Sequence, residues 1–151
     1  MTGVLAVGAA SWVGWNQLQL QKRQTRLIEN DLKIQLLEKR TACVRSMREI
    51  FYEWHAHVRL EHEQWRNFYN LMDEVELLFP KDVYDDIAKA VDGTLWSKLH
   101  YERALQYHGE GKTDIAQERS QKSWDEEENV SEVMPRLLNA MVRNTRIDAW
   151  E

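Results

Sequence analysis

The residues best suited to chemistry gather in one short stretch, WHAHVRLEHEQW, from Trp54 to Trp65. On a helix His55 and His62 share one face because they lie seven residues apart, but Arg59 lies between them on that face. A metal site needs three or four converging ligands, and an arginine among them opposes a cation. The Glu-x-x-His motif that binds iron in helical bundles does not occur in the chain. The sequence therefore predicts no metal site.

Other catalytic patterns are also missing from the sequence. There is no Gly-x-Ser-x-Gly elbow, and Cys43 has the basic neighbour Arg40 but no base at helical spacing. The residues Gly109, Gly111, Lys112 and Thr113 resemble only the tail of a phosphate-binding loop, because the leading glycine is absent. We therefore predict that the chain is not an enzyme and that it holds no cofactor.

Length and composition indicate one helical domain. The chain has 151 residues, and its two prolines, six glycines and 43% hydrophobic residues are typical of a mostly helical protein. Its single cysteine excludes an internal disulfide and suits a reducing compartment. We expect Cys43 to pack in the interior rather than to react.

The net charge of −5 conceals two halves of opposite sign. From Gln17 to Leu60 nine Lys/Arg face five Asp/Glu, a net charge of +4, whereas the residues from Glu61 onward carry a net charge of −9. This polarity predicts different neighbours for the two ends of the chain. Nucleic acid is disfavoured as a partner, because the basic stretch lacks interleaved aromatic residues and the whole chain is acidic.

The N-terminal segment predicts membrane attachment. No charged residue occurs from Gly3 to Trp15, and two tryptophans there are typical of an interfacial belt. The basic residues Lys22, Arg23 and Arg26 follow and are expected to contact lipid headgroups. The anchor residues that we predict are Val4, Leu5, Val7, Trp12, Val13 and Trp15.

The length of this segment leaves its placement open. Thirteen helical residues cover roughly 20 Å, whereas a bilayer core is about 30 Å thick, and extension to Leu20 brings polar amides into the segment. Either the natural chain begins further upstream, or the segment spans a locally thinned membrane. A buried helix of a soluble protein is the alternative, and a cleaved signal peptide is disfavoured because no positive residue precedes the apolar run. The positive-inside rule predicts that the N-terminus faces out and that the body is cytoplasmic.

A second apolar pattern predicts a long helix from Leu27 to Phe79, without proline or glycine. Apolar residues alternate at steps of three and four, once Glu61 is allowed to fill one position, as in a helix of a bundle or coiled coil. A break between Leu60 and Glu63 is the alternative, and it would place Glu61 in a solvated turn. The packing residues predicted on this face are Val44, Met47, Phe51, Trp54, Val58, Trp65, Phe68, Met72, Val75 and Phe79.

Helix signals continue to the end of the chain. Pro80 ends the long helix, and a further helix is expected from Lys81 to Tyr107, with a kink or interruption at Gly93. The turn HGEGKTD precedes a last helix, for which Asp114 begins a capping box and in which Pro135 produces a kink or a break. We predict an all-α fold with a membrane anchor at 1–20, a basic juxtamembrane helix at 21–48 and a cytoplasmic antiparallel helical bundle at 49–151.

Through the segments LKIQLLEKR, DEVELLFPKDVYDDIAKAV and ENVSEVMPRLL, the chain resembles a family of small uncharacterised bacterial inner-membrane proteins, which have one N-terminal transmembrane helix and a cytoplasmic helical domain. The first is LKIQLLEKR, from Leu32 to Arg40, which follows the apolar N-terminus and its basic exit. The others are DEVELLFPKDVYDDIAKAV, through Leu77, Leu78 and Phe79, and ENVSEVMPRLL, with Pro135. The resemblance implies location in a bacterial inner membrane and this architecture, but no activity.

These patterns together predict a membrane-tethered helical interaction or scaffold protein. Its partners are expected to be membrane lipid and either copies of itself or another helical protein, because the basic stretch from Gln17 to Arg48 is too sparsely apolar to be self-sufficient. The alternative function is a membrane-anchored effector or sensor that responds to a small anionic ligand. A basic pocket in the bundle would favour the effector, and an apolar interior would favour the scaffold.

Overall fold

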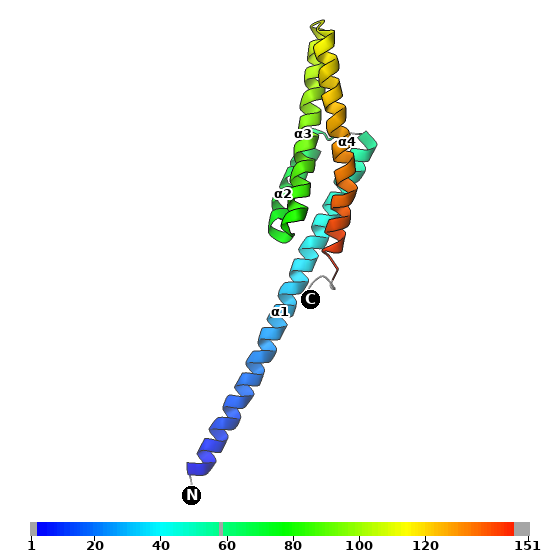
Figure 1. Ribbon diagram of the computed structural model, residues 1–151. Coiled ribbons are helices and arrows are strands. Elements are labelled where there is room, and N and C mark those ends of the chain that lie inside the picture. The colour runs from blue at the N-terminus through cyan, green and yellow to red at the C-terminus, as the bar shows by residue number, and fades with distance from the viewer. Residues whose placement is uncertain (1–2, 58, 147–151) are drawn as a thin grey trace. The chain divides into compact units, whose positions relative to one another are not determined.

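The computed structural model describes residues 3–57 and 59–146, which form helices and short connections with no strand (Figure 1). The four helices are α1 (Gly3–His57), α2 (His62–Leu78), α3 (Lys81–Gly109) and α4 (Thr113–Arg143). The expected all-α fold is therefore confirmed.

The chain divides into two compact units, Met1–Glu38 and Lys39–Glu151. Within its described residues, the first unit is the N-terminal part of α1, which we call the α1 arm. The second unit contains the rest of α1 with α2, α3 and α4, and consecutive helices in it run in opposite directions (Figure 1). This bundle begins at Lys39, before the boundary predicted at residue 49, because Cys43, Val44 and Met47 are already buried in its core.

One hydrophobic core receives side chains from all four helices of the bundle. The prediction that Trp54, Phe68 and Phe79 are buried is confirmed, since 2%, 0% and 7% of their surfaces are exposed. Val44, Met47 and Val75 also lie in this core, and Phe51, Trp65 and Met72 are partly buried against it. Val58 lies outside the described residues. Helices α3 and α4 complete the core through Ile87, Val91, Val130, Met134, Leu137 and Met141.

The single long helix predicted through Glu61 is wrong, and the alternative of a break between Leu60 and Glu63 is confirmed. Helix α1 ends at His57 and α2 begins at His62, so that Glu61 is the exposed residue before α2. The side-chain Oε1 of Gln64 accepts a hydrogen bond of 2.8 Å from the Glu61 backbone N–H. This bond satisfies a donor that the helix itself cannot pair, and so it favours a helix start at this point.

Neither Gly93 nor Pro135 interrupts its helix, contrary to the break allowed at each. Gly93 is needed for packing, because a Cβ at this position would lie 2.5 Å from Cγ2 of Val130. Helix α4 continues through Pro135 and begins at Thr113 after Lys112, so the capping box predicted from Asp114 is also wrong. The turn itself is confirmed between α3 and α4, and Gly111 there has a φ of +75°, which glycine adopts without strain.

Candidate functional surfaces on the α1 arm and between α1 and α2

Two of the predicted anchor residues have described side chains, and both are exposed. Trp12 and Trp15 expose 68% and 63% of their surfaces, and Leu18 and Leu20 follow with 54% and 58%. The remaining anchor residues lie in α1, but their side chains fall outside the described part of the structure: Val4, Leu5, Val7 and Val13. Large apolar side chains on the arm therefore lie in solvent, where they are available to another surface.

The transmembrane span predicted within Gly3–Leu20 is not found. Across residues 3–57 and 59–146, no helix has a stretch that is both long enough and apolar enough to cross a bilayer. The physical reason is visible in the sequence, since Asn16, Gln17 and Gln19 follow the short uncharged run.

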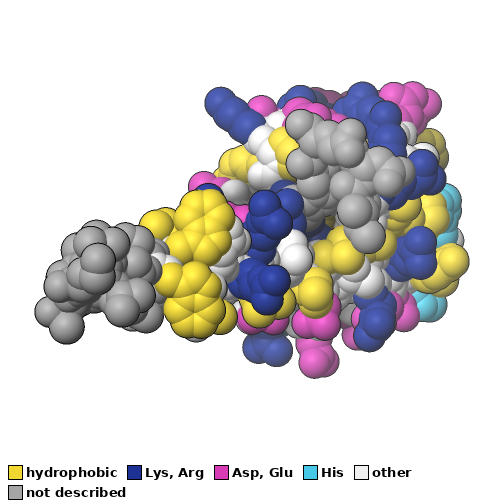
Figure 2. All heavy atoms as spheres, turned by 90° about the horizontal axis from the view of Figure 1, so that it is seen from below, with side chains coloured by type: hydrophobic (Ala, Val, Ile, Leu, Met, Phe, Trp, Pro, Cys, Tyr) yellow, Lys and Arg dark blue, Asp and Glu magenta, His cyan; other side chains and the backbone are white. Residues whose placement is uncertain are grey.

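Basic side chains follow the apolar ones along the arm. Lys22, Arg23 and Arg26 are all exposed, and their contact with lipid headgroups stays a prediction. Figure 2 looks at the molecule from the N-terminal end of α1 and shows hydrophobic side chains on the arm with Lys and Arg side chains next to them. The arm thus combines apolar and cationic groups, which is the combination that favours an anionic interface.

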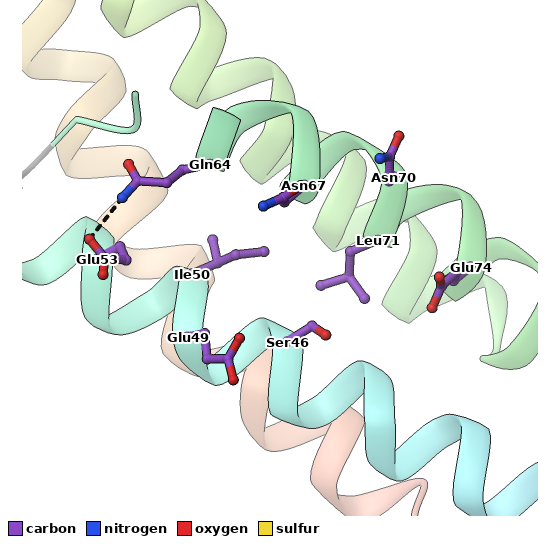
Figure 3. Close-up of a pocket in the computed structure, with 9 residues that line it drawn as sticks. All are labelled: Ser46, Glu49, Ile50, Glu53, Gln64, Asn67, Asn70, Leu71 and Glu74. Atoms are coloured by element: carbon purple, nitrogen blue, oxygen red, sulfur yellow. Dashed lines mark hydrogen bonds between the residues drawn. The ribbon is translucent and has the colours of Figure 1, made fainter. Parts of the chain in front are cut away.

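A polar cleft lies between α1 and α2 within the bundle, and we call it the α1–α2 groove (Figure 3). Its volume is about 530 Å³, and Ile50 and Leu71 point into it from the two helices. At one end Nε2 of Gln64 donates a hydrogen bond of 2.8 Å to Oε2 of Glu53. The other residues that line the groove are Ser46, Glu49, Asn67, Asn70 and Glu74.

The groove has the chemistry of a site for cationic side chains. Its lining contains three carboxylates and no lysine or arginine. Ile50 and Leu71 expose only 6% and 4% of their surfaces, and polar and apolar groups contribute about equally to the accessible walls. Carboxylates and amide oxygens accept hydrogen bonds from lysine and arginine, whose aliphatic stems pack on apolar groups. Sequence reasoning missed this groove, because its two walls come from different helices.

A buried polar cluster joins the segment between α1 and α2 to helices α3 and α4. The Arg59 NH2 group lies 2.9 Å from Oε1 of Glu127, and the Arg59 guanidinium carbon lies 3.5 Å from the centre of the Tyr101 ring. Ser97 and Ser123 are fully buried, and the Ser97 hydroxyl donates a hydrogen bond of 3.0 Å to the same carboxylate oxygen. The Ser123 hydroxyl has two acceptors in reach, the backbone oxygen of Ser97 at 3.0 Å and this carboxylate oxygen at 3.2 Å. We call these five residues the Arg59–Glu127 cluster.

The sequence contains one signal for this cluster that we did not use. Ser123 occupies a position in a series of buried residues on α4 that recur at steps of seven: Ala116, Ser123, Val130 and Leu137. A hydroxyl in an apolar series requires a hydrogen-bond partner, and the carboxylate one turn later, Glu127, supplies it.

The thiol of Cys43 lies in the core and is 1% exposed, which confirms the expected burial. Burial raises its pKa to about 12, and the Glu74 carboxylate, which accepts a hydrogen bond of 3.4 Å from Sγ, contributes to the rise. The thiolate is the reactive form of cysteine, and this environment opposes it.

We expect Cys43 to resist alkylation in the native protein. At about pH 8 iodoacetamide should label it at least about 1,000-fold more slowly than in denaturant, because the thiolate fraction falls with the raised pKa and the side chain is buried. Mass spectrometry of the full chain over time measures the rate, and the denatured chain is the control. Labelling of the native protein at the denatured rate would contradict the burial of the thiol.

The histidines of α1 and the turn at residues 109–113 make ordinary local contacts. The ring of His55 packs edge-on against Phe51 at 4.4 Å, and Nε2 of His57 lies 3.7 Å from the Glu53 carboxylate. Among the described residues, no three or more His, Cys, Asp or Glu side chains are placed to hold a metal ion. In the turn Nζ of Lys112 lies 2.8 Å from Oε2 of Glu110, and this hydrogen bond lowers the pKa of Glu110 and raises the pKa of Lys112.

Comparison with models of known protein families, with curated proteins and with solved structures gives no match for this chain. The resemblance carried by the segment from Leu32 to Arg40 therefore stays a prediction.

Proposed function

We propose that this chain is a membrane-tethered helical interaction protein, in which the α1 arm attaches to a bilayer and the bundle presents binding surfaces. The observation that supports the proposal best is the order of exposed groups on the arm. Trp12, Trp15, Leu18 and Leu20 are exposed, and Lys22, Arg23 and Arg26 follow within two turns.

Each part of this order matches one layer of a membrane interface. Tryptophan favours the headgroup level, where its ring is buried and its N–H stays hydrated. Each basic residue close to anionic lipid gains about 1 kcal/mol, so that the three together strengthen attachment about 100-fold. Because basic residues next to a membrane segment favour the cytoplasmic side, we propose that the bundle lies on the cytoplasmic side of a bacterial inner membrane.

The clefts of the bundle favour an interaction protein over an effector that binds a small anion. The α1–α2 groove is acidic, and a second cleft of about 390 Å³ between α3 and α4 is lined by Asp92, Glu126 and Glu132 with a single lysine, Lys89. Neither lining has the excess of basic groups that an anionic ligand requires. The enzyme hypothesis gains no support from the Arg59–Glu127 cluster, because the Glu127 carboxylate is already occupied by the Arg59 guanidinium and the Ser97 hydroxyl.

Vesicle flotation of the full chain tests the tether. We expect the protein to float with vesicles that contain phosphatidylglycerol, and neutralisation of Lys22, Arg23 and Arg26 to glutamine to weaken binding about 100-fold at low salt. Replacement of Trp12 and Trp15 by serine should also weaken it, on neutral vesicles as well as anionic ones.

The matched control removes charge from a different part of the same helix. Arg45 and Arg48 are exposed basic residues of α1 within the bundle, and their change to glutamine should leave flotation almost unaltered. The tether would be refuted if the intact chain stays unbound on anionic vesicles. It would also be refuted if the changes at Arg45 and Arg48 weaken binding as much as the changes at Lys22, Arg23 and Arg26.

A further inference from the structure

We infer that the α1–α2 groove binds the basic face of the α1 arm of a second copy of this chain, so that the protein associates with itself. This contact is distinct from the tether, since it joins two protein surfaces and requires no lipid.

One of the three carboxylates of the groove has no hydrogen-bond or ion-pair partner among the described residues. Glu53 accepts a hydrogen bond from Gln64, and Glu74 accepts one from Cys43, whereas Glu49 is exposed and has no hydrogen bond or ion pair in the described part of the chain. Glu49 belongs to the lining of the groove, and Figure 3 shows it on α1 at the outer edge, whereas Ile50 and Leu71 point into the space between the helices. A carboxylate at the mouth of an acidic groove is a strong attractor for an incoming cation.

The arm carries the complementary face. Leu27 and Ile34 lie seven residues apart and expose 68% and 55% of their surfaces. Arg26 and Lys33 precede them with the same spacing and are exposed as well, so that each cation lies beside an apolar side chain, with the exposed residues 29–31, Glu-Asn-Asp, in the turn between the two pairs. Lys33 lies about 10 Å along the helix from Arg26, farther than the Debye length of about 8 Å, and is therefore available for protein rather than lipid.

Charge complementarity favours a second copy as the occupant. The groove lining contains three carboxylates and no lysine or arginine, while the exposed arm residues from Lys22 to Lys33 include four Lys/Arg against two Asp/Glu, a net charge of +2. Every copy carries both surfaces, so that each contact offered by one copy can be satisfied by another. The aliphatic stems of the basic side chains would pack on Ile50 and Leu71 while their charged ends reach the carboxylates.

Sedimentation equilibrium of the full chain without lipid tests the inference. We expect masses above the 18.0 kDa of one chain as concentration rises, with weaker association at high salt. Glu49→Lys and Lys33→Glu should each weaken association about tenfold or more, and the two changes together should restore it. Glu128→Lys, at an exposed position of α4, is the matched control and should have no effect.

Crosslinking identifies the two surfaces directly. On a Cys43→Ala background, Asn30→Cys in one sample, an exposed position one turn from both Arg26 and Lys33, and Ser46→Cys in another should give a covalent heterodimer with a short bismaleimide only when the samples are mixed. Replacement of Ser46→Cys by Glu128→Cys should abolish that product. A single-chain mass at all concentrations, or association that neither charge reversal changes, would overturn the inference and leave the vesicle result for the tether untouched.

Discussion

Replacement of Phe68 by alanine is expected to lower the free energy of unfolding by about 3–5 kcal/mol. Phe68 has no exposed surface and lies in the core to which all four helices contribute. Its removal would leave a cavity that the surrounding helices can fill only in part, and the lost contacts add to that cost. Urea unfolding of the full chain, followed by circular dichroism, measures the change.

Leu77 supplies the control for this measurement, because it lies in the same helix and exposes 84% of its surface. Leu77→Ala should change stability by less than about 0.5 kcal/mol. If Phe68→Ala and Leu77→Ala unfold at the same urea concentration, the packing of α2 in the bundle is wrong.

Disruption of the Arg59–Glu127 cluster is expected to have the second largest effect. Arg59→Met removes the partner of a carboxylate whose side chain is only 13% exposed, and should destabilise the protein by about 2 kcal/mol. The figure is below that for a fully buried pair, because the Arg59 side chain is 32% exposed and the Ser97 hydroxyl still donates to Glu127. A double-mutant cycle with Glu127→Gln should give a coupling energy above about 1 kcal/mol.

The ion pair between Arg136 and Asp86 is the matched control, with an N–O distance of 3.0 Å and an Arg136 side chain that is 61% exposed. Its coupling energy should be below about 1 kcal/mol, since solvent and salt screen it. Equal coupling energies for the two pairs would contradict the role of burial. The comparison therefore distinguishes a buried ion pair that stabilises the segment between α1 and α2 from an exposed ion pair that contributes little to stability.

The sequence predicted those parts of the fold that depend on local pattern. Steps of three and four residues identified the packing face of α1 and α2, and Pro80 and the turn around Gly111 marked helix ends, because backbone restrictions act within a few residues. The membrane span was predicted from Gly3 to Leu20 because apolar and aromatic residues are grouped there, but the amides from Asn16 onward leave the apolar run too short for a span.

The remaining features depend on residues that are distant in the sequence. Glu49 and Glu74 lie on different helices, so that the α1–α2 groove exists only once those helices pack. Arg59 and Glu127 are 68 residues apart, and no local spacing relates them. Gly93 was interpreted as a weak point in α3, whereas its actual role depends on Val130 of the facing helix.

The contact between Gly93 and Val130 also limits how this protein can evolve. A side chain cannot be added at position 93 while Cγ2 of Val130 stays 2.5 Å from the place that the new Cβ would occupy. Substitutions at the two positions should therefore be coupled: alanine at 93 becomes acceptable only where residue 130 has lost that methyl group, as in Val130→Ala. In related sequences, residues 93 and 130 are expected to covary in size, and independent variation would show that α3 and α4 can separate at this point.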